Sequence, residues 1–426
     1  MRARLESLFS RPAPALLPAL LLALLLAGGA ARAQGDTDQD GPDGPDSQEL
    51  YRDALRSITE GRRDDASETL RRVIEKEPLH AGAWLDLALI QCGLGRAAEA
   101  ERLFEAIERR FAPPPEIRKL IEQTRADGCN GWEPRAQYSV SVGRGIDRNV
   151  NQGADSAVYH PSSSNGGELV LLPEFLPKHD QYTLLSADYI RDVTPNGSQA
   201  FVQYQNRRND TLRDYDSTAL FAGIDTPWRH GNWKLRTTAS VGLTTLGGHL
   251  YQRQAQLQGQ LMPPLPLPGS VQFSLHTGIT HVDYKTLENF RGNTAELRGQ
   301  LVYRGGDSYA SASVGALNDR ASEDRPGGNR HGTLVSLQWR RLLPGQATGE
   351  LGYTRQTWQS RDAYAPGLIE EVRAQTTQVW RAAVTYPLDK NQNLVLEARR
   401  TQNQENISIF QYNDRQLQLS WQWLSP

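Results

Sequence analysis

Two different spacings of apolar residues divide the chain. Over residues 49–125 the apolar positions recur every three to four residues, as on one face of an amphipathic helix. After Trp132 apolar and polar residues alternate. On one side of a typical run are Leu235, Thr237, Ala239, Val241 and Leu243, and on the other are Lys234, Arg236, Thr238, Ser240 and Gly242. The pattern predicts an α + β multidomain protein, helical first and then built of strands.

The alternating runs are each about ten residues long, enough to cross a membrane as a tilted strand. We count about 14 of them between Arg135 and Trp423. A large soluble sandwich would need two apolar inner faces, whereas the polar faces of these runs carry Gln and Arg throughout. We therefore expect an antiparallel transmembrane β-barrel over residues 134–426.

The connections between runs fall into two classes. Short turns follow the even-numbered strands, at residues 195–197, 227–232, 263–269, 305–307, 344–345 and 387–391. Most connections after odd-numbered strands are longer, at 146–180, 286–293, 320–330, 360–373 and 403–413, with 244–248 as the exception. Outer-membrane barrels have short periplasmic turns and long outer loops. An even strand count also leaves both barrel ends in the periplasm, which is where we expect the helical domain.

The first residues have the composition of a secretory signal peptide. Arg2, Arg4 and Arg11 precede an apolar stretch at residues 16–27. Ala31-Arg32-Ala33 fits the small-residue rule for cleavage before Gln34. The alternative is a membrane anchor, but polar residues follow at once. We assign 1–33 to a signal peptide, 34–47 to a flexible tether and 48–128 to the helical domain.

The helical domain contains an internal repeat with an offset of about 34 residues. Ala66, Leu70, Val73 and Pro78 correspond to Ala100, Phe104, Ile107 and Ala112. The pattern resembles the tetratricopeptide repeat and covers two copies, with a further helix at 115–125 as a cap. Five residues carry the pattern and are predicted to pack the repeats or to dock a partner: Trp84, Leu87, Ala88, Ala100 and Phe104. The domain as a whole is expected to be a docking surface.

The last alternating run has an aromatic and aliphatic face made of Leu417, Leu419, Trp421 and Trp423. Such a terminal strand resembles the signal by which the barrel-assembly machinery recognises its clients. Aromatic residues near other strand ends suit the girdles that outer-membrane barrels place at the two membrane interfaces: Trp228, Trp233, Trp358 and Tyr386.

Composition and charge remove several classes of function. The net charge is −2, so no basic excess indicates a nucleic-acid partner. Cys92 and Cys129 both lie in the helical part, and an exported chain could join them in a disulfide. Two thiols without a nearby histidine pair make a metal site improbable.

The sequence predicts neither enzyme chemistry nor a cofactor. It contains no phosphate loop and no nucleotide fingerprint. His276 is expected to point into the barrel and His281 away from it, so His276 is interpreted as a polar lining residue. Five acids at positions 147, 155, 168, 174 and 180 accompany the first long loop, where we expect them to be solvated rather than to bind a cation.

The start of the barrel carries the sequence Gly-Arg-Gly-Ile-Asp-Arg-Asn-Val-Asn at residues 143–151. With the repeats and the barrel of about 14 strands, it resembles the Slam family, the surface lipoprotein assembly modifiers. That family often has an Asp-x-Asn-Val-Asn element here, which corresponds to Asp147, Asn149, Val150 and Asn151, with Arg148 at the variable place.

This resemblance implies an outer-membrane translocator that moves client lipoproteins or secreted proteins from the periplasm to the cell surface. Its partners would be the client, the barrel-assembly machinery during biogenesis, and outer-membrane lipid. The alternatives are an exopolysaccharide-export porin with periplasmic repeats, a passive porin and, last, a barrel enzyme. Export porins generally have many more repeats, and a passive porin would not explain the repeats at all.

Overall fold

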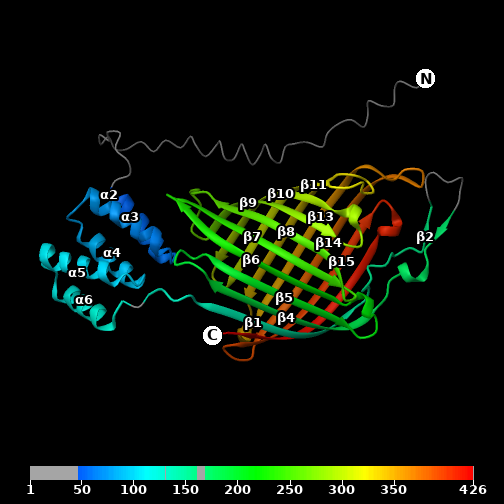
Figure 1. The fold of residues 1–426 in the computed structure, drawn as a ribbon. Helices are drawn as coiled ribbons and strands as arrows, with labels where there is room; N and C mark the ends of the chain where they lie inside the picture. The colour runs from blue at the N-terminus through cyan, green and yellow to red at the C-terminus, as the bar shows by residue number, and fades with distance from the viewer. Residues whose placement is uncertain (1–46, 130, 161–167, 426) are drawn as a thin grey trace, which may run out of the picture. The chain divides into compact units, whose positions relative to one another are not determined.

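The computed structural model describes residues 47–129, 131–160 and 168–425. The predicted signal peptide and nearly all of the predicted tether lie outside these residues. The fold class predicted from the sequence is confirmed: within the described residues, five helices precede a closed antiparallel barrel of 14 strands. Figure 1 shows the helices followed by the barrel.

The helical part is a stack of short amphipathic helices. They are α2 (Ser47–Thr59), α3 (Arg63–Lys76), α4 (Ala81–Gly93), α5 (Ala97–Phe111) and α6 (Pro115–Asp127). Two apolar clusters fill the stack, one around Leu70 and Val73 and the other around Phe104 and Ile121. The repeat alanines Ala66, Ala88 and Ala100 are fully buried, which lets neighbouring helices approach closely.

Two covalent or ionic links fix the end of this stack. Cys92 and Cys129 form a disulfide with their Cα atoms 4.5 Å apart, so the segment after α6 is tied to α4. Arg125 on α6 donates to both Glu101 and Glu108 on α5, at 2.7 and 2.8 Å. Because most repeat stacks need about three repeats, these links replace part of the packing that a third repeat would supply.

The barrel closes when its first strand pairs with its last. β1 pairs with β4 on one side and with β16 on the other, so every membrane strand has two neighbours. The strands are β1 (Ala136–Asp147), β4 (Asp180–Asp192), β5 (Gln199–Asn209), β6 (Ser217–His230), β7 (Trp233–Leu246), β8 (His249–Met262), β9 (Val271–Tyr284), β10 (Gly292–Gly305), β11 (Ser308–Ala321), β12 (Arg330–Leu342), β13 (Thr348–Ala365), β14 (Ile369–Pro387), β15 (Gln392–Glu405) and β16 (Tyr412–Leu424).

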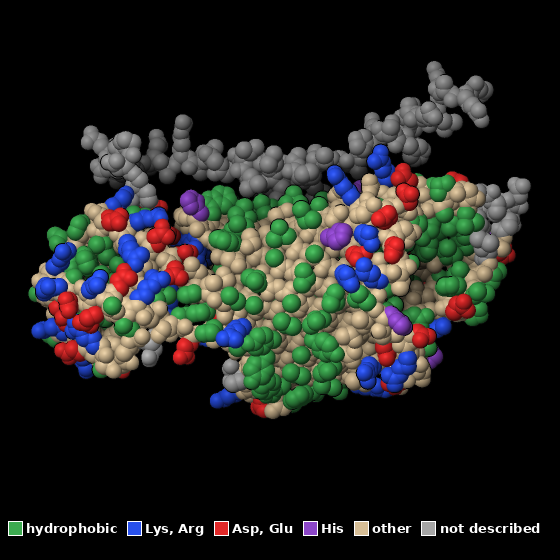
Figure 2. Space-filling model, viewed as in Figure 1, with side chains coloured by type: hydrophobic (Ala, Val, Ile, Leu, Met, Phe, Trp, Pro, Cys, Tyr) green, Lys and Arg blue, Asp and Glu red, His purple; other side chains and the backbone are tan. Residues whose placement is uncertain are grey.

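Side chains on the outer face of the barrel are apolar and exposed. Val241, Leu257 and Leu297 each expose about three fifths of their surface (62%, 59% and 60%), which only a lipid environment makes favourable. Figure 2 shows apolar side chains spread over the outer face of the strands in this view. The outer face is therefore that of a transmembrane barrel. Among the described helices, none is long and apolar enough to span a membrane.

Aromatic residues form a girdle at one end of the barrel. Tyr138, Tyr189, Trp228, Trp233, Tyr303, Trp339, Tyr386 and Trp421 are all outward and 39–55% exposed, near the ends of strands that are joined by short turns. Trp358, which the sequence placed in a girdle, is not part of one. It lies an odd number of residues from the outward Leu351 on β13, so it points inward, where Arg330 covers its ring at 4.5 Å.

The two ends of the barrel differ in their connections. Turns after β4, β6, β10, β12 and β14 have two to six residues and the turn after β8 has eight; this end is called here the short-turn end. The opposite end carries the long connection between β1 and β4, which includes the small sheet β2 (Val158–Tyr159) and β3 (Leu169–Val170). The expected long loop at 360–373 is instead a hairpin, because β13 and β14 continue pairing as far as Ala365 and Ile369 across two register shifts.

Candidate functional site

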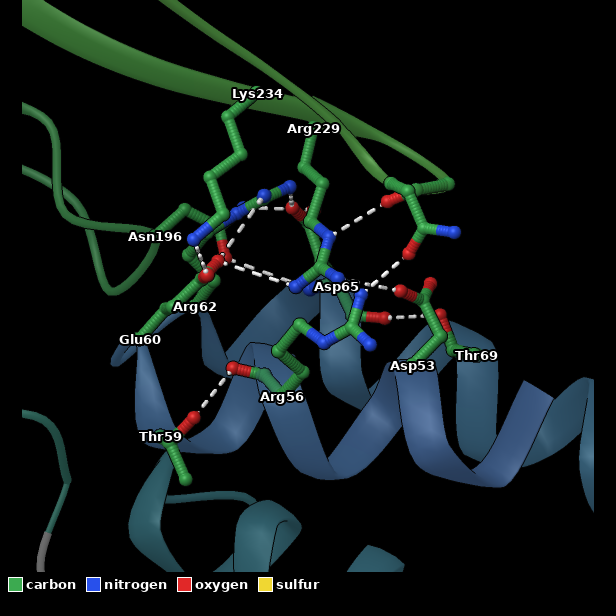
Figure 3. A network of polar contacts seen from close by, with 12 residues as sticks. Asp53, Arg56, Thr59, Glu60, Arg62, Asp65, Thr69, Asn196, Arg229 and Lys234 are labelled. Carbon is green, nitrogen blue, oxygen red and sulfur yellow. Dashed lines mark hydrogen bonds and ion pairs between the residues drawn. The ribbon is translucent and has the colours of Figure 1, made fainter. Parts of the chain in front are cut away.

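Polar side chains join the helices α2 and α3 to two turns at the short-turn end of the barrel. We call this contact the junction, and Figure 3 shows its residues. The helical side supplies Asp53, Arg56, Glu60, Asp64 and Asp65; the barrel side supplies Asn196, Arg229, Asn232 and Lys234. The contact is polar and charged, which is typical of domain interfaces that can separate.

Arg229 is the centre of the junction. Its side chain is only 2% exposed and lies between Asp53 at 2.8 Å and Glu60 at 3.2 Å. Its Nε also donates to the carbonyl of Gly231, at 2.8 Å, which holds the guanidinium at the β6–β7 turn. An arginine buried this deeply needs compensating charge. Asp53 of α2 and Glu60 just after α2 supply it.

Glu60 connects the same turn to the end of α2 through a second cation. Lys234 Nζ lies 2.5 Å from one carboxylate oxygen, and Arg229 contacts the other. Burial alone would raise the pKa of Glu60, but the hydrogen bond and charge of Lys234, with the charges of Arg229 and Arg62, outweigh it and lower the pKa below 4.5. The carboxyl group is therefore held in its ionised form.

Asn196 of the β4–β5 turn caps the helix α3. The residue that precedes this helix, Arg62, makes no side-chain capping hydrogen bond. Asn196 Oδ1 instead accepts from the backbone N–H groups of Asp64 and Asp65, at 3.1 and 3.4 Å. A free N–H at a helix start needs such an acceptor, so the barrel completes the helix.

The predicted repeat residues are largely unavailable to a partner. Leu87, Ala88, Ala100 and Phe104 are 3% exposed or less and belong to the helical core. Trp84 is half-buried, donates to the carbonyl of Pro78 at 3.0 Å and is covered by Arg110. A client would therefore contact other side chains of the helical domain.

The inner face of the barrel is polar. Gln252, Gln254, Gln256, Gln258 and Gln260 line one strand, β8, on the side opposite Leu257. Across four neighbouring strands a row of ion pairs runs in order: Arg340, Glu350, Arg381 and Glu397, with contacts of 2.6, 2.9 and 2.7 Å. Arg340, Glu350 and Arg381 of this row line a cavity of about 410 Å³. This part of the inner wall is therefore polar and charged, in contrast to the apolar outer face.

His276 lies on the inner face and His281 on the outer face, as their pairing partners on β8 show. His276 Nε2 is 3.0 Å from Ser274 Oγ, a contact that the interpretation of His276 as a lining residue did not include. The Ser274 side chain belongs to a residue only 2% exposed, so a substrate in the barrel could not reach it. The pair is therefore a packed polar contact of the wall.

The Asp-x-Asn-Val-Asn element orders the start of the long β1–β4 connection. Asp147 accepts from Arg207 at 2.6 Å. Asn149, 2% exposed, donates to the carbonyls of Gly153 and Asn413, both at 3.0 Å, and accepts from the Gly153 N–H. Asn151 bridges to residues 174–178 on the far side of the loop, where Val150 N–H also donates to Lys178 O. In the structure these residues hold a loop rather than face open solvent.

The terminal strand face is outward. Leu417 and Leu419 are 45% and 49% exposed, and Trp421 donates to Gln392 at 2.9 Å. Trp423 pairs with Val140 and stacks on Tyr138 with ring centroids 5.3 Å apart. This strand therefore presents an apolar face while it closes the barrel.

Acids of the first long loop are used in several ways. Asp155 accepts from Asn413, and Asp180 accepts from the backbone of Thr211 and Leu212 at 2.8 and 2.7 Å. Glu168 and Glu174 are exposed. Over residues 47–129, 131–160 and 168–425 there is no group of three or more His, Cys, Asp or Glu side chains placed to hold a metal ion.

The junction residues were not singled out from the sequence. Arg229 and Lys234 appeared only within a predicted turn and a predicted strand, and Glu60 only within the helical range 49–125. A usable signal does exist: two cations flank the β6–β7 turn, and two acids, at 53 and 60, lie in and just after the first described helix. Their pairing depends on tertiary contact across the two domains, which spacing along the chain does not encode.

Comparisons with known proteins agree with the helical part of the fold. A tetratricopeptide repeat model matches residues 57–124. The search of curated proteins gives no match. Among solved structures, the chain is similar to the outer membrane channel DcaP of Acinetobacter baumannii, with 12% identity, 68% of this chain and 97% of that chain covered, and a TM-score of 0.39.

Two further solved structures resemble the barrel. They are an anion-selective porin from Comamonas acidovorans, with 9% identity, coverage of 69% and 99%, and a TM-score of 0.35, and a Pseudomonas aeruginosa FadL homologue, with 8% identity, coverage of 68% and 90%, and a TM-score of 0.37. At this identity and TM-score the likeness says nothing of what passes through this barrel.

Proposed function

We propose that this chain is an outer-membrane translocator, which delivers specific client proteins from the periplasm to the cell surface. The clients would be surface lipoproteins or related secreted proteins, as the resemblance to the Slam family implies. In this proposal the helical domain lies in the periplasm, engages the client and presents it to the barrel, which provides or gates the route.

The observation that carries the proposal is the junction. The helical domain contacts two turns at the short-turn end through Arg229, Lys234 and Asn196. In outer-membrane barrels the short turns face the periplasm. A client bound to the repeats would be held beside the barrel entrance, which raises its effective concentration there.

The driving force would come from the client itself. No nucleotide pool serves the outer membrane, so the energy of a one-way transfer would be supplied by folding or binding of the client outside. The polar inner face, with its glutamines and the row of ion pairs from Arg340 to Glu397, supports passage of an unfolded, hydrated segment.

The test is surface exposure in a strain that lacks this gene. Whole cells are treated with protease or labelled with a surface biotin reagent, and the set of exposed proteins is identified. This set is compared between the deletion strain and the same strain complemented with the wild-type gene, with Glu60→Lys, or with the control Glu122→Lys. Glu60→Lys reverses a charge that contacts Arg229 and Lys234, whereas Glu122 is exposed on α6.

We expect one or a few proteins to be trapped in the periplasm of the mutant, to be exported by wild type and the control, and to be exported poorly by Glu60→Lys. Loss of extracellular polysaccharide with unchanged protein exposure would instead support the export-porin alternative. If neither the exposed proteins nor the extracellular polysaccharide changes in the deletion strain, the translocator proposal is rejected.

A further inference from the structure

Three arginines converge inside the barrel at the end opposite the junction. Arg325 belongs to the β11–β12 loop, Arg330 begins β12, and Arg373 lies near the start of β14. With Phe290, Pro326, Trp358, Ser360 and Gln375, they line one small cavity. The three come from separate parts of the chain, so the cluster is a product of the closed fold.

The arginines outnumber the acids that face them. Asp319 contacts both Arg325 Nη1, at 3.0 Å, and Arg330 Nε, at 2.5 Å. Glu405, whose side chain is fully buried, accepts both Nε and Nη2 of Arg373, at 2.9 and 2.6 Å. In these contacts three guanidinium groups share two carboxylates.

One donor of this cluster is buried without an acceptor. The Arg325 side chain is 4% exposed, and its Nη2 makes no hydrogen bond to any described part of the chain. Leaving a charged donor without an acceptor costs free energy, more than for a neutral group. Burial also lowers the pKa of Arg325 below its ordinary value, as expected where negative charge is insufficient.

The cavity sets the size of a ligand that would complete the cluster. Its volume is about 20 Å³, which holds one water-sized particle. Arg330 and Arg373 both lie over aromatic rings, of Trp358 at 4.5 Å and Phe410 at 4.6 Å, and this fixes the direction of their guanidinium groups. A large ligand does not fit, whereas a monatomic anion does.

We propose that Arg325, Arg330 and Arg373 form a binding site for a small inorganic anion of the size of a halide, which fixes the β11–β12 loop against the inner wall of the barrel. The proposal does not rest on the function proposed above. It assigns the ligand by charge, donor and size.

Bromide is the probe, and the full-length protein in detergent is the sample. Thermal unfolding is followed as sodium bromide replaces sodium gluconate at constant ionic strength. We expect a saturable rise of a few degrees in Tm, consistent with ligand binding to the native state. The rise should be lost in Arg325→Gln and in the milder Arg330→Gln, and should be kept in the exposed control Arg320→Gln.

A second measurement protects the test from variants that fold poorly. Wild-type crystals soaked in bromide should show an anomalous peak within about 3.5 Å of the Arg325 and Arg330 guanidinium groups. Absence of this peak together with a bromide response that is equal in all variants would overturn the proposal and assign an ordered water to the cavity.

Discussion

Arg229 shows how one side chain can define a domain contact. It is nearly inaccessible to water although it lies at the end of β6, because Asp53 of α2 and Glu60 just after α2 both contact it. Each exposed ion pair on a protein surface contributes little, but a guanidinium shielded on both sides depends on its partners.

Replacing Arg229 with Gln is expected to loosen α2 from the barrel. The two α2 carboxylates would lose their shared cation, and amide hydrogen exchange in α2 should become about tenfold faster, or ~1.4 kcal/mol. Arg341→Gln, an exposed arginine beside another turn of the same rim, is the control. Equal exchange in both variants would contradict a role for Arg229 in docking.

The junction should also weaken in acid. Glu60 has a pKa below 4.5 in the folded protein, so its contribution is complete above that value and is lost as the pH falls through the lowered pKa. Hydrogen exchange of α2 should therefore accelerate below about pH 4.5, relative to α5, once the intrinsic pH dependence is removed. In Glu60→Gln this acid-dependent step should be absent.

Asn149 is expected to be essential for order in the long β1–β4 connection. Asn149→Ala removes three hydrogen bonds and leaves buried backbone groups without partners, at a cost of roughly 1–3 kcal/mol for each. Trypsin should then cleave faster at Arg148 or Lys178. Thr286→Ala, in another loop at the same end, should leave the cleavage rate unchanged.

At the level of elements, the two faces of each strand should respond oppositely to charge. Leu257 points outward and is 59% exposed, whereas its neighbour Gln258 lines the interior. Leu257→Arg should destabilise the barrel in lipid vesicles by about 2–4 kcal/mol, since arginine would lie in the apolar layer. Gln258→Arg should change urea unfolding far less, and equal effects would show that the face assignment is wrong.

The disulfide is expected to stabilise the helical element that it encloses. Joining Cys92 to Cys129 closes 37 residues, which by chain entropy contributes about 3–4 kcal/mol. Reduction of the full-length protein should increase hydrogen exchange in α6 and leave the barrel strands protected. Exchange in α6 that does not depend on reductant would indicate that Arg125 and the apolar core are sufficient.

The elements could be predicted from the sequence where a simple period governs them. A period of two fixes which side of a strand meets lipid, so Val241 and Ser240 were assigned to opposite faces. Trp358 was misplaced because an aromatic near a strand end was judged by its type and not by its parity with Leu351. The extended β13–β14 hairpin was missed because the two register shifts interrupt the alternation.

The contacts that give the molecule its candidate sites could not be predicted in this way. Arg229 meets α2, and Arg325 meets Arg330 and Arg373, only after the barrel has formed. Such contacts depend on the angle and register between whole elements. A local sequence pattern does not predict that angle or that register. The resemblance to a translocator family indicated the two domains and left the contacts between them open.

At the scale of the whole molecule, the pairing of β1 with β16 has a consequence for biogenesis. The contact from Ser139 to Leu424 joins the two ends of the barrel sequence, and its closure entropy alone is about 5 kcal/mol. Pairing among the earlier strands does not offset this entropy, because the growing sheet keeps two unpaired edges until the final strand pairs with β1. The helical domain, with mostly local contacts, can mature while the strands are still incomplete. A chain at that stage is a folded helical domain linked to an unfinished sheet, and the two free edges, at β1 and β16, stay unpaired until they meet.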